Sequence, residues 1–369
     1  REKNDGSDLP ICGVSKDGLI PPKQKDADTS IYNVFYRDDF IFNPARMELN
    51  SIAINDMYDR AICSSLYEVF YVHRTDLLLP HYLKLIIRQK WFTRYCEFLG
   101  QGSAREYCRF GNISEIEIEF PPIEEQQKIV DYNTAIENRI ALKQKINDNL
   151  VAIGTASIQK NVGRGALINL TEAEMDRLTF PKDFKVENMS EFCIETKSGS
   201  TPSRTTKEYW KNGTISWVKS GEVHNNITLQ TEEYITPLGL TESSTKSLPK
   251  DTVLMAMYGV TAGEVGYLAI EAATNQAICG MICHSEAEAA YLYFSLIQSQ
   301  AAISRLSNGG AQDNLSKNFI DNIKIVVPPS KFIEKLNLAA IVEQMTLNTK
   351  EIILLEELQA TVLAQLSSR

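Results

Sequence analysis

The sequence has no apolar run of the roughly 20 residues that a membrane-spanning helix needs, so we expect no transmembrane segment. The opening residues lack the pattern of a signal peptide, so we expect none. The seven cysteines are an odd number, scattered through a chain too large to need disulfide staples. These absences predict a protein of the reducing cytoplasm. The first residue is Arg1 rather than Met, as a missing N-terminal stretch would leave it.

Motifs for nucleotide and cofactor chemistry are also absent. There is no P-loop and no dinucleotide fingerprint, and the glycines between positions 259 and 266 lack the required spacing. The run Asn43-Pro-Ala-Arg46 begins like the Asn/Asp-Pro-Pro-aromatic motif of amino-methyltransferases and departs at once. The four histidines have no evident Ser or Cys partner. We therefore predict no catalytic site and no cofactor on this chain.

Two residue groups resemble metal or nuclease sites but are better explained otherwise. Cys279, Cys283 and His284 have no second Cys/His cluster to complete four ligands, so we predict a buried strand and no metal there. Asp183 with Glu195-Thr-Lys197 faintly resembles a nuclease Asp…Glu-x-Lys site, without the usual Pro-Asp start. A nuclease that acts through Glu195 and Lys197 stays open as a minor alternative.

Positive charge is scarce overall but concentrated locally. The net charge is −9, which argues against a surface that is basic all round. Residues 81–109 nevertheless carry six Lys/Arg against two Glu, and residues 197–219 carry five against one. Such patches can bind a polyanion, because phosphate contacts act within about a Debye length of ~8–10 Å. Solvated helix faces remain an equally good explanation for each patch alone.

The chain contains one internal repeat. Residues 102–122 align without a gap on residues 309–329, 207 positions later. Seven positions are identical, namely Gly102/Gly309, Ala104/Ala311, Ile113/Ile320, Ile116/Ile323, Ile118/Ile325 and the Pro pairs 121–122/328–329. The period far exceeds the roughly 20–50 residues of a solenoid repeat, so it predicts two domain-sized units.

Each unit shows short β runs followed by a helix, a Gly-rich loop and a strand. In the first unit we predict strands at 31–36, 60–63, 67–72 and 116–120 and a helix over 81–98. In the second unit we predict strands at 214–218, 252–258 and 265–270 and a helix over 290–306. Each copy of the repeat then leads into a long helix, over about 124–160 and about 331–366.

The two long helices carry apolar seams that need a partner. Pairing them with each other, antiparallel, is the simplest solution, and ~36 residues at 1.5 Å each would span roughly 55 Å. Such a rod would hold the two globular units apart. The alternative is that each helix folds onto its own domain.

Several motifs resemble the specificity subunit of a type I restriction–modification system, and the resemblance covers essentially the whole chain. It rests on Pro-Pro-Ile-Glu-Glu-Gln-Gln-Lys-Ile at 121–129 with Asn138-Arg-Ile and Asn149-Leu, which resemble the entry to the family's first spacer helix. A second stretch resembles the motif that opens a recognition domain in this family. It consists of Lys-Ser-Gly-Ser-Thr-Pro-Ser-Arg at 197–204, followed by Tyr209-Trp210 and by Ile-Ser-Trp-Val at 215–218. Residues 308–316 resemble the motif that closes a recognition domain in this family. Residues 38–46 resemble part of a variant recognition domain.

The sequence also departs from the family pattern. The second spacer entry, from Pro329 to Leu336, lacks the Glu-Gln pair. The first unit lacks the Gly-Ser-Thr-Pro motif and is shorter than the second. Either it belongs to a different subtype or its first strand is absent here.

The resemblance implies an α+β fold with two globular target recognition domains, separated by two long antiparallel coiled-coil helices in a pseudo-twofold internal repeat. The expected boundaries are 1–120 and 166–328 for the recognition domains and 121–165 and 329–369 for the spacer helices. In this family each recognition domain reads half of a split, asymmetric double-stranded DNA target. The helices bind two methyltransferase subunits that carry S-adenosylmethionine, and a restriction/translocase subunit joins for host defence. The chain itself would be non-catalytic.

Candidate contact residues follow from the residue types in the loops, since hydroxyls, cations and amides suit phosphates and base edges. For DNA binding we select Lys16, Arg37, Arg46, Arg105, Tyr107, Ser200, Thr201, Ser203, Arg204, Lys207, Lys219, Ser220, Tyr258, Thr261, Gln312 and Asn314. For partner binding we select seam residues of the helices, Ile129, Ile136, Ile140, Met345, Ile352 and Leu355. A role in a turn or in fold stability is the alternative for each DNA candidate. For the whole chain, the alternative is a two-headed coiled-coil scaffold for proteins that does not bind DNA.

Overall fold

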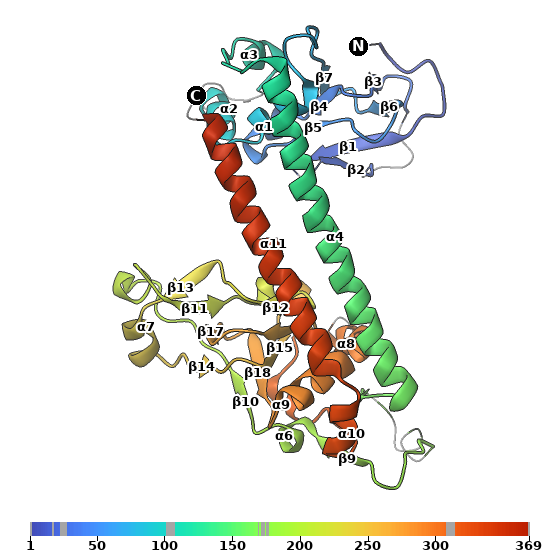
Figure 1. Ribbon diagram of the computed structural model, residues 1–369, viewed down its shortest axis with the longest axis vertical. Coiled ribbons are helices and arrows are strands. Elements are labelled where there is room, and N and C mark those ends of the chain that lie inside the picture. The colour runs from blue at the N-terminus through green and yellow to red at the C-terminus, as the bar shows by residue number, and fades with distance from the viewer. Residues whose placement is uncertain are drawn as a thin grey trace. The chain divides into compact units, whose positions relative to one another are not determined.

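A computed structural model describes residues 2–16, 18–22, 28–100, 108–168, 170, 174, 177–307 and 314–367. The chain divides into two compact units: unit 1 comprises residues 1–140 and 354–369, and unit 2 comprises residues 141–353 (Figure 1). Both divisions fall inside the long helices, so each unit contains part of each helix. The domain boundaries expected from the sequence follow the helix ends instead and stay a prediction.

The strands of unit 1 form two small sheets. They are β1 Ile11–Ser15, β2 Gly18–Ile20, β3 Asn33–Tyr36, β4 Phe40–Phe42, β5 Ile52–Ile54, β6 Arg60–Cys63 and β7 Glu68–Phe70. One sheet has the order β2-β1-β6-β3, with β1 parallel to β6, and the other has the antiparallel order β5-β4-β7. The strands predicted at 31–36, 60–63 and 67–72 are confirmed.

The single helix predicted over 81–98 is wrong, because two helices occupy this stretch. They are α1 Pro80–Ile87 and α2 Lys90–Gly100. Ile87 and Phe92 both lie in the core that covers β4 and β5. Five residues apart, they would point about 140° away from each other on one continuous helix. The break at Arg88 and Gln89 turns both side chains to the same core.

Unit 2 is built mainly of two sheets. Its strands are β8 Ala166–Leu167, β9 Lys185–Asn188, β10 Glu195–Ser198, β11 Ile215–Val218, β12 Ile227–Thr228, β13 Glu233–Ile235, β14 Ser247–Leu248, β15 Thr252–Ala256, β16 Val265–Leu268, β17 Ala272–Thr274, β18 Ile278–Ile282 and β19 Lys324–Val327. The larger sheets have the orders β10-β18-β15-β16-β12 and β13-β11-β17-β14. The three strands predicted for this unit are confirmed, and Cys279 lies fully buried in β18, as predicted.

Helix α8 Glu286–Ser307 fills the core of unit 2, which confirms the helix predicted over 290–306. Its Tyr291, Tyr293 and Phe294 side chains are fully buried. Two short helices complete the unit around β19, namely α6 Met189–Phe192 and α9 Lys317–Asp321. Strand β19 lies between β8 and β9 and is hydrogen-bonded to both.

The repeat is visible in the structure, with one difference. Helix α3 Phe110–Ser114 of unit 1 lies 207 positions before α9, and α2 ends at Gly100 where α8 ends at Ser307. The strand predicted at 116–120, which is the counterpart of β19, is not formed in the described part of the chain. Residues 116–120 have no strand beside them there, so their alternating pattern did not suffice to make a sheet.

The first long helix is continuous and the second is interrupted. Helix α4 runs over Ile123–Asn161, close to the prediction, and Gly163 with a φ of 83° follows its end. The second helix consists of α10 Ser330–Lys335 and α11 Leu338–Ser367, so the unbroken helix predicted over 331–366 is wrong. Asn337 has a φ of 54°, a left-handed conformation that an α-helix cannot contain. Among the described residues, no helix is long and apolar enough to cross a membrane.

Helices α4 and α11 pair with each other, as predicted (Figure 1). In unit 2, Lys143 Nζ lies 2.7 Å from Glu351 Oε2, and Asn348 Nδ2 donates to Asn147 Oδ1 at 2.9 Å. Residue numbers therefore rise along α4 as they fall along α11, which makes the pair antiparallel. Met345, predicted in the seam, is buried, whereas Ile153 is exposed and lies outside it.

Candidate nucleic-acid interface

Unit 1 contains a large cleft that brings together cations from distant parts of the sequence. Its volume is about 1190 Å³, and it is lined by Lys16, Arg46 and Arg88 together with one acidic residue, Glu48. All three cations are exposed, and among the described residues none has a carboxylate within 4 Å. A cavity of this size exceeds that of most small-molecule sites. Its charge favours an anionic macromolecule.

Local structure places Arg46 at this cleft. Asn43 caps the short helix η1 Pro44–Leu49 by accepting a hydrogen bond from the Ala45 N–H at 3.1 Å. Beyond the helix, Ser51 Oγ donates to the Val14 carbonyl at 3.1 Å and so ties this turn to β1. Lys16 follows β1 directly, which brings it to the same cleft. The sequence, in which Lys16 and Arg46 lie thirty positions apart, does not indicate that both line the same cleft.

The other candidates of unit 1 lie elsewhere. Arg37 does not line the cleft. Its guanidinium donates to Asp59 Oδ1 at 2.9 and 3.0 Å and to the Asp56 carbonyl at 3.0 Å. Arg105 and Tyr107 lie outside the described residues. Arg88 was not selected from the sequence, although it stands in the basic stretch 81–109 that pointed to it.

In unit 2 the loop after β10 is fixed by hydrogen bonds to its backbone. Trp217 Nε1 donates to the Ser200 carbonyl at 3.1 Å, and Thr245 Oγ1 donates to the same oxygen at 3.0 Å. Trp210 Nε1 donates to the Ser203 carbonyl at 3.0 Å. The loop hydroxyls also have partners: Ser200 with Ser244, Thr201 with Gln276, and Ser203 with Thr205. The result is a preorganised loop with hydroxyls along its surface.

Arg204, in this loop, is stacked on aromatic rings. Its Cζ lies 3.6 Å from the centroid of the Trp210 ring and 5.0 Å from that of Trp217. Its guanidinium is also paired with the carboxylate of Glu233. The hydrogen bond from Arg204 lowers the pKa of Glu233. Arg204 is therefore held against the loop and orients it, although half of its side chain remains exposed.

The two lysines of this region differ in their surroundings. Lys219 Nζ lies 2.5 Å from Glu232 Oε2 and 3.4 Å from Glu233 Oε1, and the hydrogen bond to Glu232 raises the pKa of Lys219. Lys207 is exposed and has no carboxylate within 4 Å among the described residues. Ser220 begins a short turn beside Lys219. Of the selected cations of unit 2, Lys207 is the one most available to a phosphate.

A second group of candidates meets at the turn between β15 and β16. Tyr258 forms an isolated β-bridge with Asn314, and Thr261 ends the short turn η4 Gly259–Thr261. The structure thus joins Tyr258 and Asn314, which the sequence separates by 56 positions; Gln312 lies outside the described residues. Val260 was not selected, yet its side chain is fully exposed at the tip of this turn. A methyl-bearing side chain there suits the methyl group of thymine.

The residues that resembled catalytic or metal sites have ordinary surroundings. Lys197 Nζ lies 2.8 Å from Glu195 Oε2, an ion pair within one strand. In the part of the chain that the structure describes, no group of three or more His, Cys, Asp or Glu side chains could hold a metal ion. Neither observation supports a nuclease site at Glu195 and Lys197.

The helix pair presents apolar side chains to solvent. Of the seam residues selected for partner binding, Ile136 and Met345 are buried within the chain, and Ile129, Ile140, Ile352 and Leu355 are half-buried. Other apolar side chains of the two helices are exposed and better placed to meet a partner, namely Tyr132, Leu142, Ile153, Leu347, Leu354 and Leu358. Exposed apolar side chains that form a contiguous patch are typical of a protein–protein contact surface.

Known proteins are similar to this chain in fold or in sequence. The type I restriction–modification S subunit from M. genitalium, solved by crystallography, superposes with a TM-score of 0.55 at 14% identity and covers 99% of this chain and 90% of its own. The Type I restriction enzyme HindI specificity subunit of Haemophilus influenzae is 22% identical over 321 residues, which is 70% of each chain. The MjaIX specificity subunit of Methanocaldococcus jannaschii is 22% identical over 301 residues, covering 79% of this chain and 69% of its own.

The family model that matches is described as the type I restriction modification DNA specificity domain. It matches twice, at residues 26–152 and 181–357. The two matches fall on the two halves of the internal repeat, each with much of the long helix that follows. Together they cover more than half of the sequence, and so this chain belongs to the type I restriction–modification DNA specificity family.

Proposed function

We propose that this chain reads a bipartite, asymmetric DNA target, with one half-site for each unit. The observation that carries the proposal is that the two units repeat the same helices at equivalent positions but differ in their polar surfaces. Helices α3 and α9 occupy equivalent positions 207 residues apart. Unit 1 offers a cleft with three cations that have no carboxylate partner among the described residues, whereas unit 2 offers a preorganised hydroxyl loop and an exposed turn. Different surfaces on one frame support different half-sites.

The two surfaces supply both kinds of contact that DNA recognition needs. Lys16, Arg46, Arg88 and Lys207 suit phosphate oxygens, which position a protein on the duplex. Tyr258 and Asn314 suit base edges, because an amide can pair with adenine in the major groove. Arg204 would act through the loop it orients rather than as a free phosphate ligand.

The helices would bind two methyltransferase subunits, and a restriction/translocase subunit would join the complex. The exposed apolar side chains of α4 and α11 support this role. In this proposal the methyltransferase subunits carry S-adenosylmethionine, and the present chain contributes recognition and no catalytic group.

A map of modified bases, in cells with and without this chain, tests the function directly. We expect a split motif to lose its methylation when the chain is deleted. In cells that carry Arg46→Ala with Arg88→Ala, methylation should weaken or relax at one half of that motif. Arg37→Ala is the matched control, because this cation is paired outside the cleft. An unchanged map after deletion would favour the protein scaffold without DNA binding.

A further inference from the structure

Val260 is the most exposed large apolar side chain in the part of the protein that the structure describes. It lies in the turn η4, between strands β15 and β16 of unit 2. In the stretch 252–263, every residue is buried except the three at 258–260. The turn therefore presents a single apolar side chain to solvent, at the tip of an otherwise buried stretch of chain.

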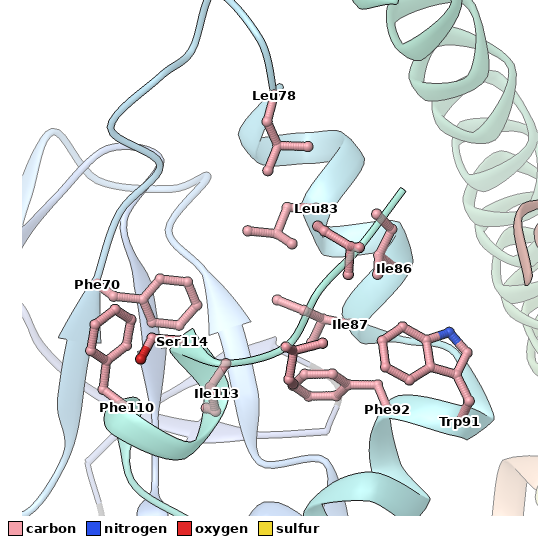
Figure 2. A pocket seen from close by; sticks show the side chains of 12 residues that line it. Phe70, Leu78, Leu83, Ile86, Ile87, Trp91, Phe92, Phe110, Ile113 and Ser114 are labelled. Atoms are coloured by element: carbon pink, nitrogen blue, oxygen red, sulfur yellow. The ribbon is translucent and has the colours of Figure 1, made fainter. Parts of the chain in front are cut away.

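Neither the core nor the turn accounts for a valine at this position. A fully exposed side chain gains no free energy from burial. Turns favour Gly, Pro, Asn, Asp and Ser, whereas a β-branched side chain is typical of strands. In unit 1, by contrast, the apolar side chains of Phe70, Phe110 and Ile113 gather in one groove (Figure 2). Val260 has no such packing among the described residues, so contact with a bound molecule is the role that remains for it.

The turn holds Val260 in a fixed place. The Gly263 N–H donates to the Ala256 carbonyl at 2.8 Å, and the Ala256 N–H donates to the Glu264 carbonyl at 2.9 Å. Gly263 has a φ of 88° and lies against α8, where a Cβ would come 2.9 Å from Ser304 Oγ. A branched valine side chain also has few rotamers. Little conformational entropy is therefore lost when a bound molecule covers it.

The neighbours of Val260 suit the major groove of DNA. Tyr258 forms the β-bridge with Asn314, and both side chains are exposed, so a phenol and an amide can meet base edges beside the valine. The apolar group that unmodified DNA offers in the major groove is the C5-methyl of thymine. Side chains that wedge between stacked bases are longer than valine, such as Phe, Leu and Met. Val260 can therefore cover a methyl group but is too short to separate base pairs.

We propose that Val260 recognises a thymine by covering its C5-methyl group in the major groove. The half-site of unit 2 then contains an A·T pair at that position, and Tyr258 and Asn314 bond to neighbouring base edges. This inference rests on the proposed function, because it names a base that unit 2 reads. It assigns base reading in this turn to Val260 rather than to Thr261, whose side chain is buried.

Deoxyuridine in place of thymine tests the contact, because it lacks the methyl group and keeps the same hydrogen-bonding edge. The probe is a labelled duplex that carries the split motif found in the map of modified bases, with each thymine replaced in turn. The protein is the full chain together with the subunits that co-purify with it. We expect one replacement to weaken binding about threefold to fivefold through the loss of one buried methyl group.

Val260→Ala should remove this preference, so that the same replacement leaves the affinity of the variant nearly unchanged. Val186→Ala makes the same substitution at an exposed valine of β9 and should keep the full preference. Both valines are exposed, so neither variant removes packing from the core.

Two results would overturn the inference while the proposed function stands. One is a split motif that contains no thymine in either half. The other is a set of replacements whose effects are the same in wild type and in Val260→Ala. Failure of the wild-type complex to bind the unmodified motif would instead overturn the proposed function itself.

Discussion

At the scale of single residues, the three cations of unit 2 selected for DNA binding divide into two that are paired with carboxylates and one that has no such partner among the described residues. Arg204 is stacked on Trp210 and paired with Glu233, and Lys219 is paired with Glu232. Lys207 has no such partner among the residues that the structure describes. A count of positive charges in the sequence cannot make this distinction, because it depends on which carboxylates the fold brings near.

Lys207→Ala should weaken binding of specific and unrelated duplexes by a similar factor. A lost phosphate contact also lowers the slope of log affinity against log salt by about one. Arg204→Lys should act differently, since it keeps the charge but loses the planar stack, and we expect it to reduce discrimination between sequences. Fluorescence anisotropy titrations at several salt concentrations measure both. Equal salt slopes for wild type and Lys207→Ala would contradict the assignment.

Glu233 makes the stability of unit 2 depend on pH in a defined direction. Its pKa is lowered in the folded state by the hydrogen bond from Arg204, so the stabilisation is present above the ordinary carboxyl pKa of about 4.3 and is lost as pH falls through the lowered value. Glu233→Gln should therefore lower the Tm of unit 2 at pH 6–7, with a difference that shrinks at acid pH. Thermal melts across that range measure it. Glu271→Gln is a suitable control, because that carboxylate accepts a hydrogen bond from Ser247 and has no cation within 4 Å in the described part of the chain.

At the scale of elements, the break between α10 and α11 depends on one residue. Asn337 has a φ of 54°, which costs a residue with a Cβ roughly 1–2 kcal/mol but suits Asn and Gly. We expect Asn337→Ala to destabilise unit 2 by about 1 kcal/mol. Asn337→Gly should stay close to wild type. Denaturant unfolding monitored in unit 2 measures the difference, and an unchanged midpoint for the alanine variant would show that the break is not strained.

The packing of α4 on α8 depends on the absence of a side chain at Gly154. A Cβ at this position would lie 2.4 Å from the ring of Phe294, which is fully buried. Gly154→Val should therefore destabilise unit 2 by about 1–3 kcal/mol, as overpacking does. Ala152→Val is the control on the exposed face of the same helix. A similar loss of stability in both variants would attribute the effect to helix propensity instead.

Sequence patterns predicted the elements well wherever periodicity alone decides them. The β runs at 60–63 and 252–256 and the helices α4 and α8 follow from alternation or helical spacing. The failures are places where tertiary structure overrides the local pattern. The break at Arg88 and Gln89 serves to turn Phe92 into a core, and residues 116–120 have the right alternation but no neighbour to pair with.

The candidate site was less predictable than the fold. The loop at 200–207 was selected because its residue types suit DNA, but its rigidity comes from Trp210 and Trp217, which only the fold brings together. The cleft of unit 1 joins Lys16, Arg46 and Arg88 from three separate stretches of the sequence. Periodicity shows which side chains lie on the same face of a helix or strand, but not which other elements pack beside it. It therefore could not predict that these three cations line one cleft.

At the scale of the whole molecule, unit 1 includes residues 354–369 from the other end of the chain. Gln359 Nε2 donates to Asn133 Oδ1 at 3.0 Å, and both side chains belong to unit 1. Truncation after Ile353 should therefore expose the apolar side of α4 and destabilise unit 1 while unit 2 stays folded. Hydrogen–deuterium exchange, read separately for residues 123–140 and for β15–β18, measures this. Equal loosening of both units would contradict the division.

This composition of unit 1 has a consequence for the order of folding during synthesis. Residues 1–140 leave the ribosome before unit 2, yet the rest of unit 1, from residue 354 onward, is made more than 200 residues later. Unit 2 is continuous in sequence, so all of it is available before those neighbours emerge. Contacts between distant residues form slowly, because a long loop must close first. We therefore expect the half of the protein that is translated first to be the last to mature, and to depend longest on protection by chaperones.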